Sequence, residues 1–207
     1  KTFIQAERII KRRFGGVYRF NSSQIAINLS YSKVISVNIV GEVISPGTFN
    51  IPAINSAFNI LSLSKGLNSN GSVRNIAIVR NGQTVGNLDI YEFMTNPKKN
   101  SFLHLFDGDF ISVPALGNVV SLKGEVNKVG SYEVKENETF RDLLKFSGGF
   151  KPLANKTTIN FTRQSSHGKI VYSYKLEEAM NIKLQNGDEI TVSKNSENIS
   201  NKISIEG

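Results

Sequence analysis

Two arginines stand out as candidate binding residues because the sequence places them at matching positions. Arg80 and Arg163 each end a strand-like segment, and each is followed by a polar turn-like stretch. A planar guanidinium group suits carboxylates, which it can bind through paired hydrogen bonds. Two roles follow for these side chains. They contact an anionic sugar or a neighbouring subunit, or they form a fork of hydrogen bonds to turn carbonyls or a nearby acid within the fold. We name Arg80 and Arg163 as candidate ligand-binding residues.

The sequence shows no arrangement of residues that favours catalysis or a metal site. His104 and His167, the only histidines, occupy non-equivalent positions, and we expect both at the surface. Asp107, Asp109 and Asp188 lie at glycine-containing turns before strands, where aspartate commonly bonds to the local backbone. The chain has no cysteine, which excludes disulfide bonds and thiolate chemistry within it. No glycine-rich phosphate loop or His/Glu metal spacing is present. We therefore expect a protein that is not an enzyme and uses no metal or cofactor.

The net charge of +8 is concentrated in one short part of the chain. Residues 1–36 carry +6, residues 37–114 are neutral, and residues 115–192 carry +2. Nucleic-acid-binding domains usually carry their basic surface on the folded domain itself. The distribution therefore argues against a nucleic-acid partner. Residues 2–14 are predicted to form an amphipathic helix with basic residues in its last turns. This helix is a surface or inter-domain element, or a docking site for an anionic partner or lipid headgroups.

A sequence motif recurs along the rest of the chain. The segment VNIVGEV at 37–43 recurs as VSLKGEV at 120–126, and ISIEG at 203–207 matches the start of the motif a third time. Over most of the unit the two copies align without a gap, so that Gly41 matches Gly124 and Arg80 matches Arg163. The second copy is slightly shorter, because its alignment shifts before Gly187-Asp188, which matches Gly108-Asp109. Such self-similarity indicates repeated structural units. We expect the chain to be part of a longer array.

Each repeat predicts the same order of elements. In the first copy, strands are expected near 33–40, 48–51, 75–80, 85–88 and 110–113, with a helix after the second strand and a short helical segment at 91–94. A further strand is expected at 24–29. Thr139 and Asp142 are predicted to cap the helix of the second copy, and Asn81-Gly82 predicts a hairpin turn. The order is typical of an α+β fold with two tandem β-grasp, or ubiquitin-like, units, each a small mixed sheet with one packed helix. The expected divisions are an N-terminal helix and lead-in strands at 1–36, units at 37–114 and 119–192, and a linker that begins a third repeat at 193–207.

The ordered string of motifs resembles the SLBB (soluble-ligand-binding β-grasp) domain. The string consists of VGEV at 40–43, PGTF at 46–49, SKG at 64–66, Arg80 and DGDFISVP at 107–114. The second copy resembles the domain too, with FSGG at 146–149 at its helix end. It departs from the usual pattern at Val129, where proline is common, and the first copy departs at Lys65, where glycine is usual.

The resemblance implies a role in polysaccharide export. Tandem SLBB domains are similar to the periplasmic part of bacterial outer-membrane polysaccharide export proteins. The family implies a ring-shaped homo-oligomer, an anionic polysaccharide, an inner-membrane co-polymerase and attachment to the outer membrane through segments outside these residues. Two alternatives stay open: a soluble glycan- or ligand-binding module, and a DNA-uptake receptor domain, against which the near-neutral repeats weigh.

Overall fold

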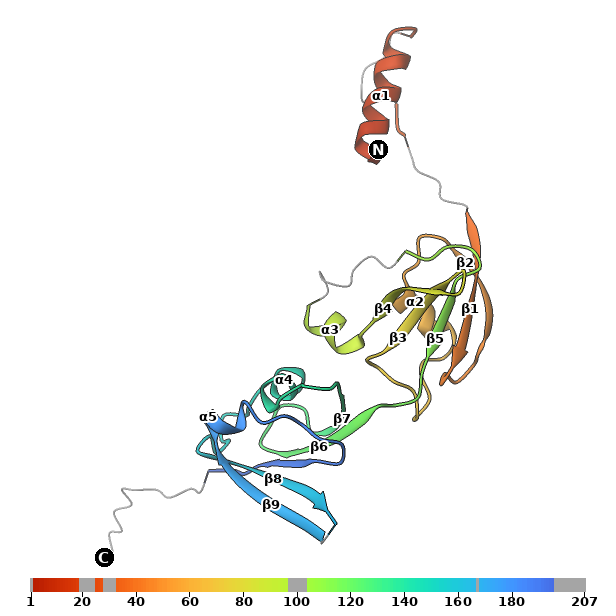
Figure 1. The fold of residues 1–207 in the computed structure, drawn as a ribbon. Helices are drawn as coiled ribbons and strands as arrows, with labels where there is room; N and C mark the ends of the chain where they lie inside the picture. Colours follow the sequence, from red (N-terminus) through yellow and green to blue (C-terminus); the bar gives the residue numbers. More distant parts are fainter. Residues whose placement is uncertain (1, 19–24, 28–32, 97–103, 167, 196–207) are drawn as a thin grey trace, which may run out of the picture.

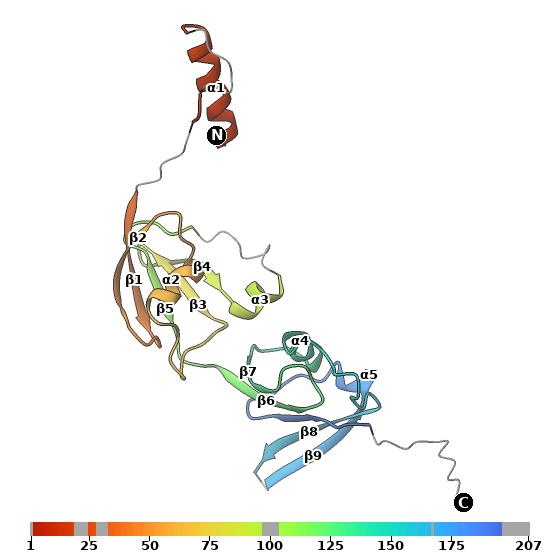
Figure 2. The ribbon, with the colours of Figure 1, turned by 180° about the vertical axis from the view of Figure 1, so that it is seen from behind.

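The computed structural model of the chain contains two five-stranded sheets that follow one another along the sequence (Figure 1). It describes residues 2–18, 25–27, 33–96, 104–166 and 168–195. The view from behind shows the same order, with the two sheet-containing units end to end and the helix α1 beyond the first (Figure 2).

The first unit contains five strands and two short helices. They are β1 (Val34–Gly41), β2 (Gly47–Pro52), α2 (Ala57–Leu63), β3 (Ile76–Arg80), β4 (Gln83–Leu88), α3 (Ile90–Thr95) and β5 (Phe110–Val113). The strand order is β2-β1-β5-β3-β4. The central pair, β1 and β5, is parallel, and the other neighbours are antiparallel.

The second unit repeats this topology. Its elements are β6 (Asn118–Gly124), β7 (Gly130–Val134), α4 (Phe140–Phe146), β8 (Thr158–Ser165), β9 (Gly168–Lys175), α5 (Leu176–Ala179) and β10 (Glu189–Val192). The order is β7-β6-β10-β8-β9, with β6 and β10 parallel. The expected α+β class with two β-grasp-like units is therefore confirmed.

Each unit has its own apolar core between the sheet and one helix. Along β1, every second side chain is buried, as expected for a strand with one covered face. In the first unit, Ile60 and Leu61 of α2 pack into the same cluster as the strand residues. The second core is more aromatic, because Phe140 of α4 and Phe161 of β8 meet edge to face at 5.7 Å.

The glycine of the repeated motif lies where two parallel strands approach closely. Gly41 and Gly124 adopt φ of 91° and 88°. A Cβ atom would lie 2.0 Å from the carbonyl oxygen of Val113 in the first unit and of Val192 in the second. No side chain fits there, so the motif requires glycine at this position for the two parallel strands to pair.

The predicted turn and cap form as expected. Asn81 and Gly82 both have positive φ, 50° and 76°, and connect β3 to β4. At the start of α4, the carboxylate of Asp142 accepts a hydrogen bond from the backbone N–H of Thr139 at 3.0 Å. These local signals could be recognised from the sequence because short-range backbone geometry determines them.

The N-terminal region differs in part from the expectation. The amphipathic helix is present as α1 (Phe3–Gly15), and none of its residues is buried. Residues 25–27 of the strand expected at 24–29 do not form a strand, and the rest of that range lies outside the described residues, as does the third copy of the motif at 203–207. Among the residues that the structure describes, no helix combines the length and apolar character needed to cross a bilayer.

Candidate functional site: the paired arginines and the junction between the units

Arg80 forms a fork of hydrogen bonds inside the first unit. Its Nε and Nη2 atoms each donate to one carboxylate oxygen of Asp109 at 2.8 Å, and Nη2 also donates to the carbonyl of His104 at 3.3 Å. The guanidinium lies over the ring of Phe106, 4.0 Å from its centroid. Asp109 is fully buried. Burial acts to raise the pKa of Asp109, but hydrogen bonds from Arg80 and the Phe106 N–H, with the positive charge of Arg80, outweigh it and hold that pKa below its ordinary value.

Arg163 repeats this arrangement in the second unit. It donates to the two carboxylate oxygens of Asp188 at 2.9 and 3.0 Å, and to the carbonyl of Lys183 at 2.6 Å. Asp188 also accepts from the backbone N–H of Gln185 at 2.9 Å. Each arginine thus ties a strand end to the turn that precedes the last strand. The geometry matches the structural role considered for these residues, and their contact with a sugar or a neighbouring subunit stays a prediction.

The remaining sequence candidates form no shared site among the residues that the structure describes. His104 is exposed and pairs with Ser56 in an isolated bridge. His167 lies outside the described residues. Asp107 accepts a hydrogen bond from the backbone N–H of Ser36 at 2.7 Å, so its carboxylate bonds a distant strand rather than the local backbone that the sequence predicted.

A buried ionic network joins the two units, and the sequence reasoning did not identify it. Arg74 of the first unit is 1% exposed. Its Nε atom bonds both oxygens of Asp89 at 2.9 and 3.0 Å. Its Nη1 and Nη2 atoms bond Glu138 of the second unit at 2.9 and 2.6 Å, and Nη1 also bonds the carbonyl of Glu133 at 3.0 Å. A cation from one unit is therefore neutralised by acids from both.

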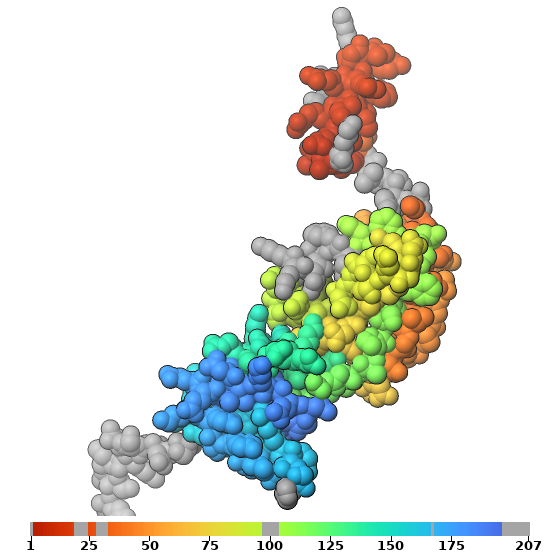
Figure 3. Space-filling model, in the orientation of Figure 1, coloured from red at the N-terminus to blue at the C-terminus, as the bar shows by residue number. Residues whose placement is uncertain are grey.

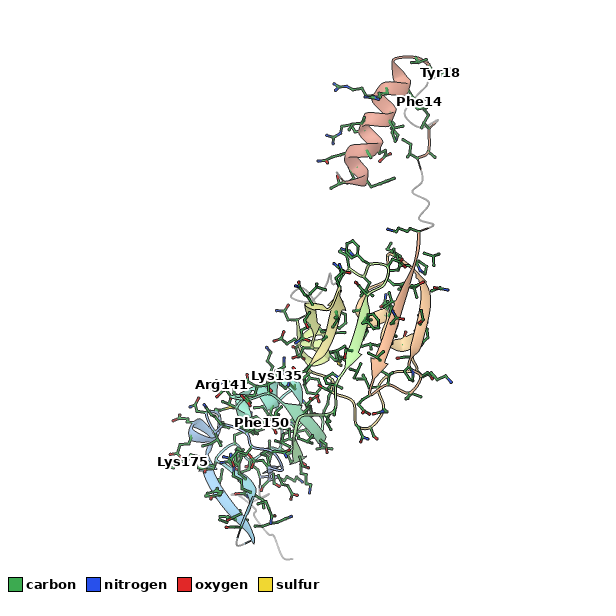
Figure 4. The ribbon with its side chains drawn as sticks, turned by 45° about the vertical axis from the view of Figure 1, so that its right-hand side comes forward. Phe14, Tyr18, Lys135, Arg141, Phe150 and Lys175 are labelled. Atoms are coloured by element: carbon green, nitrogen blue, oxygen red, sulfur yellow. The ribbon has the colours of Figure 1, made fainter. Side chains whose placement is uncertain are left out.

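The carboxylate of Glu133 binds the first unit in return. It accepts hydrogen bonds from the Ser72 hydroxyl and the Val73 N–H, both at 2.7 Å, and from the N–H of Gly117 in the connecting segment at 3.0 Å. Lys135 lies on the side of the second unit that faces the first (Figure 4). Its ammonium donates to Asp89 at 2.6 Å. The junction is thus fixed by charged hydrogen bonds in both directions.

The network shifts the pKa of its buried members toward their charged forms. Burial acts to raise the pKa of Asp89, but hydrogen bonds from Lys135 and the Glu92 N–H, together with Arg74, outweigh it and lower that pKa. Burial acts to lower the pKa of Arg74, and the hydrogen bonds and charges of Glu138 and Asp89 raise it overall. Charged groups buried in this way are stable only when well paired.

Aromatic rings from the two units surround the same arginine. The Arg74 guanidinium lies 4.8 Å from the ring centroids of Tyr91, in α3, and Phe146, in α4. The two rings are 5.1 Å apart, and Tyr132 of β7 meets Tyr91 at 6.1 Å. Figure 3 shows the α3 and α4 regions meeting where the units join. The charged network therefore continues into an aromatic contact.

A cavity of about 340 Å³ opens beside these rings. It is lined from the first unit by α3 and from the second by the β6–β7 turn, β7 and α4, and its principal side chains are Tyr91, Met94, Lys128, Tyr132, Lys145 and Phe146. Burial raises the pKa of Tyr91 and of Tyr132 above the ordinary value of a phenol. Aromatic walls with two cations suit binding rather than bond breaking.

The junction was missed because its residues are not shared between the repeats. In the alignment of the two copies, Thr157 stands opposite Arg74 and Asn50 opposite Glu133. The helix α3 is capped by Asp89, whereas Lys175 precedes the corresponding α5. A comparison of copies finds what each unit needs for folding and passes over what differs between them. The available signal was a set of charged residues that each occur in only one copy, with Arg74 in the first copy and Glu133 in the second.

Comparison with known proteins identifies the domain of the second unit. The family model of the SLBB domain matches residues 119–172, which run from β6 into β9. The chain therefore carries an SLBB domain, and the expected resemblance is confirmed there. The first unit lies outside the matched range and shares its strand order.

The chain is also similar to a transport protein over nearly its whole length. Two sequences, both described as polysialic acid transport protein KpsD from Escherichia coli, are 26% identical to it over 190 residues. The match covers 91% of this chain and 33% of each relative. The chain thus spans about a third of the length of the curated relatives it matches.

Proposed function

We propose that this chain is the periplasmic, SLBB-containing segment of a polysaccharide export protein. The observation that carries the proposal is the similarity to a polysaccharide transport protein, which extends through both units and includes a recognised SLBB domain. The role is architectural, and the chain performs no catalysis. Attachment to the outer membrane is through segments outside these residues.

The proposed mechanism is assembly of several copies into a ring that surrounds the passage of a capsular polysaccharide or exopolysaccharide. The junction supports this mechanism because it links the two units through buried charged contacts rather than a free linker. The cargo would be an anionic polysaccharide, and the inner-membrane partner would be a polysaccharide co-polymerase. No nucleic acid takes part.

The edge strand β9 is the surface that we assign to contact with a second copy. It is eight residues long and lies at the edge of its sheet. Ile170, Val171 and Tyr172 are 42%, 63% and 38% exposed. An edge strand presents unpaired N–H and C=O groups that complement another strand edge. A second copy fits because it brings strand edges of the same kind, and adding strands to a sheet is a common mode of association.

The test is complementation of a strain that lacks the full-length protein. Val171→Lys should reduce both the oligomer detected by cross-linking and the polysaccharide on the cell surface, because a charge on an edge strand opposes strand pairing. Leu153→Lys is the matched control, since Leu153 is an exposed loop residue of the same unit, and it should behave as wild type. Normal export by full-length protein from which residues 37–195 have been deleted would contradict the proposed function. Normal assembly of Val171→Lys would contradict only the assignment of β9.

A further inference from the structure

The cavity at the junction combines features that neither unit has alone. Tyr91 from the first unit and Tyr132 and Phe146 from the second supply three aromatic side chains to its lining. Its volume of about 340 Å³ lies at the lower end of the range of small-molecule sites, roughly 300–1,000 Å³. A site of this size suits one or two sugar rings rather than a folded partner.

Two lysines give the cavity a positive character. Lys128 precedes β7 and Lys145 lies in α4, and both line the cavity and are exposed. Within the described part of the chain, neither forms an ion pair, in contrast to Lys135, whose ammonium is bound by Asp89. Their charges are therefore available to an anionic ligand.

The aromatic lining is held in place by the buried network. Arg74 contacts Tyr91 and Phe146, and the Tyr132 hydroxyl donates to the carbonyl of Lys128 at 2.7 Å. Tyr91 also accepts a hydrogen bond from the Glu133 N–H at 3.3 Å. Because the rings are restrained before any ligand arrives, little conformational entropy would be lost on binding.

We propose that this junction cavity binds an acidic sugar residue, with its carboxylate at Lys128 and Lys145 and its apolar ring face against the aromatic side chains. The inference rests on the proposed function, and it adds the place where an acidic sugar of the cargo is held. Ammonium groups bind carboxylates through charge-assisted hydrogen bonds. An aromatic ring offers a flat apolar face with negative partial charge, which suits the C–H groups on one face of a sugar ring.

A saccharide explains the site better than a single-stranded nucleic acid does. Sequence-independent binding of nucleic acid requires a basic groove that follows several phosphates, with aromatic side chains for successive bases. The cavity has two lysines, and the chain from residue 37 to 192 carries a net charge of only +2. Two cations beside a compact aromatic cavity fit one carboxylated ring.

The experiment measures binding of a short oligomer of sialic acid to the 207-residue chain by calorimetry, with a neutral glucose oligomer of equal length as the ligand control. The wild-type chain should bind the acidic oligomer, more weakly as salt increases, and should not bind the neutral one. The double variant Lys128→Gln/Lys145→Gln should bind at least about tenfold more weakly, as expected from loss of hydrogen bonds to a charged group. Tyr132→Leu should also weaken binding, through loss of the ring.

A second pair of lysines provides the matched control for charge. Lys169 and Lys175 are exposed in β9, and Lys175 lies away from the side of the second unit that faces the first (Figure 4). Lys169→Gln/Lys175→Gln should bind as wild type. The inference would be overturned if both double variants bound equally weakly, or if a wild-type chain that unfolds cooperatively did not bind the acidic oligomer. It would also be overturned if single-stranded DNA bound equally tightly at the same lysines. The complementation assay reports separately on export, so loss of the site and loss of the proposed function are distinguishable.

Discussion

At the scale of the residue, the two repeats differ most clearly at one helix end. Lys65 has φ of 63°, and its counterpart Gly148 has φ of 80°. A left-handed conformation costs an L-residue roughly 1–2 kcal/mol, whereas glycine adopts it readily. The departure of Lys65 from the usual glycine is therefore a local strain that the first unit tolerates.

Replacement of this residue should stabilise the chain. Lys65→Gly removes the strain but increases the entropy of the unfolded chain, so we expect a net gain of up to about 1 kcal/mol in the free energy of unfolding. Gly148→Ala is the converse control and should destabilise by a similar amount, because alanine would be strained at a φ of 80°. Its Cβ would meet Asn127 at an ordinary 3.6 Å, so no steric clash adds to that strain. Urea unfolding followed by circular dichroism measures both. A lower midpoint for Lys65→Gly would show that the lysine side chain contributes a contact that outweighs the strain.

Other residue roles could be predicted from the sequence because local geometry determines them. Asn81-Gly82 forms its turn and Asp142 its cap. The fork of hydrogen bonds from Arg80 to an acid was one of the two roles considered. The partner Asp109 could not be chosen from sequence alone, because Arg80 and Asp109 are distant in the sequence and meet only when β3 and β5 pair.

At the scale of the element, the junction makes stability sensitive to acid. Asp89 caps α3 and binds Arg74 and Lys135, and its pKa is lowered in the folded chain. A carboxyl group with a lowered folded-state pKa contributes stability above its unfolded-state pKa of about 4. That contribution is lost as the pH falls from about 4 toward the folded-state pKa.

The variant Asp89→Asn should separate this contribution from the helix cap, because asparagine also caps helices well. At neutral pH we expect a loss of about 1–3 kcal/mol in the free energy of unfolding, as for a hydrogen bond to a charged group. The loss should shrink as the pH falls below about 4, because the unfolded wild-type chain then takes up a proton at this carboxyl group, whereas the folded chain does so only near its lowered pKa. Urea unfolding at several pH values tests this. A difference between the two chains that stays constant down to pH 2 would contradict the assignment.

The element order of each unit could be predicted, but the contact between the units could not. Alternating apolar residues and glycine turns determine the strands and helices within a single unit. The junction depends on Arg74 of the first unit meeting Glu133 and Glu138, which the sequence places far away in the second. It occurs once, so repetition gave no signal for it, and a buried arginine looks like a surface residue in a sequence.

At the scale of the whole molecule, the buried network should hold the two units in one orientation. Arg74 links acids from both units, and Glu133 binds the first unit and the connecting segment through three donors. Because the chain contains no cysteine, spin labels can be attached at Gln83→Cys and Gln164→Cys, two exposed sites, one in each unit. Pulsed electron resonance on this labelled chain should give one narrow distance distribution.

Loss of the network should broaden that distribution while each sheet stays folded. We choose Glu133→Gln/Glu138→Gln, which keeps side-chain volume and leaves both apolar cores intact. Glu138→Gln removes one partner of the buried pair with Arg74, and breaking such a pair in this way costs about 3–5 kcal/mol, so the contact between the units should open. The surface pair Lys11–Glu7 gives the control, because Glu7→Gln removes a charge from an exposed pair that contributes little. An equally narrow distribution in the double variant would show that the aromatic contact among Tyr91, Tyr132 and Phe146 is enough to hold the units together.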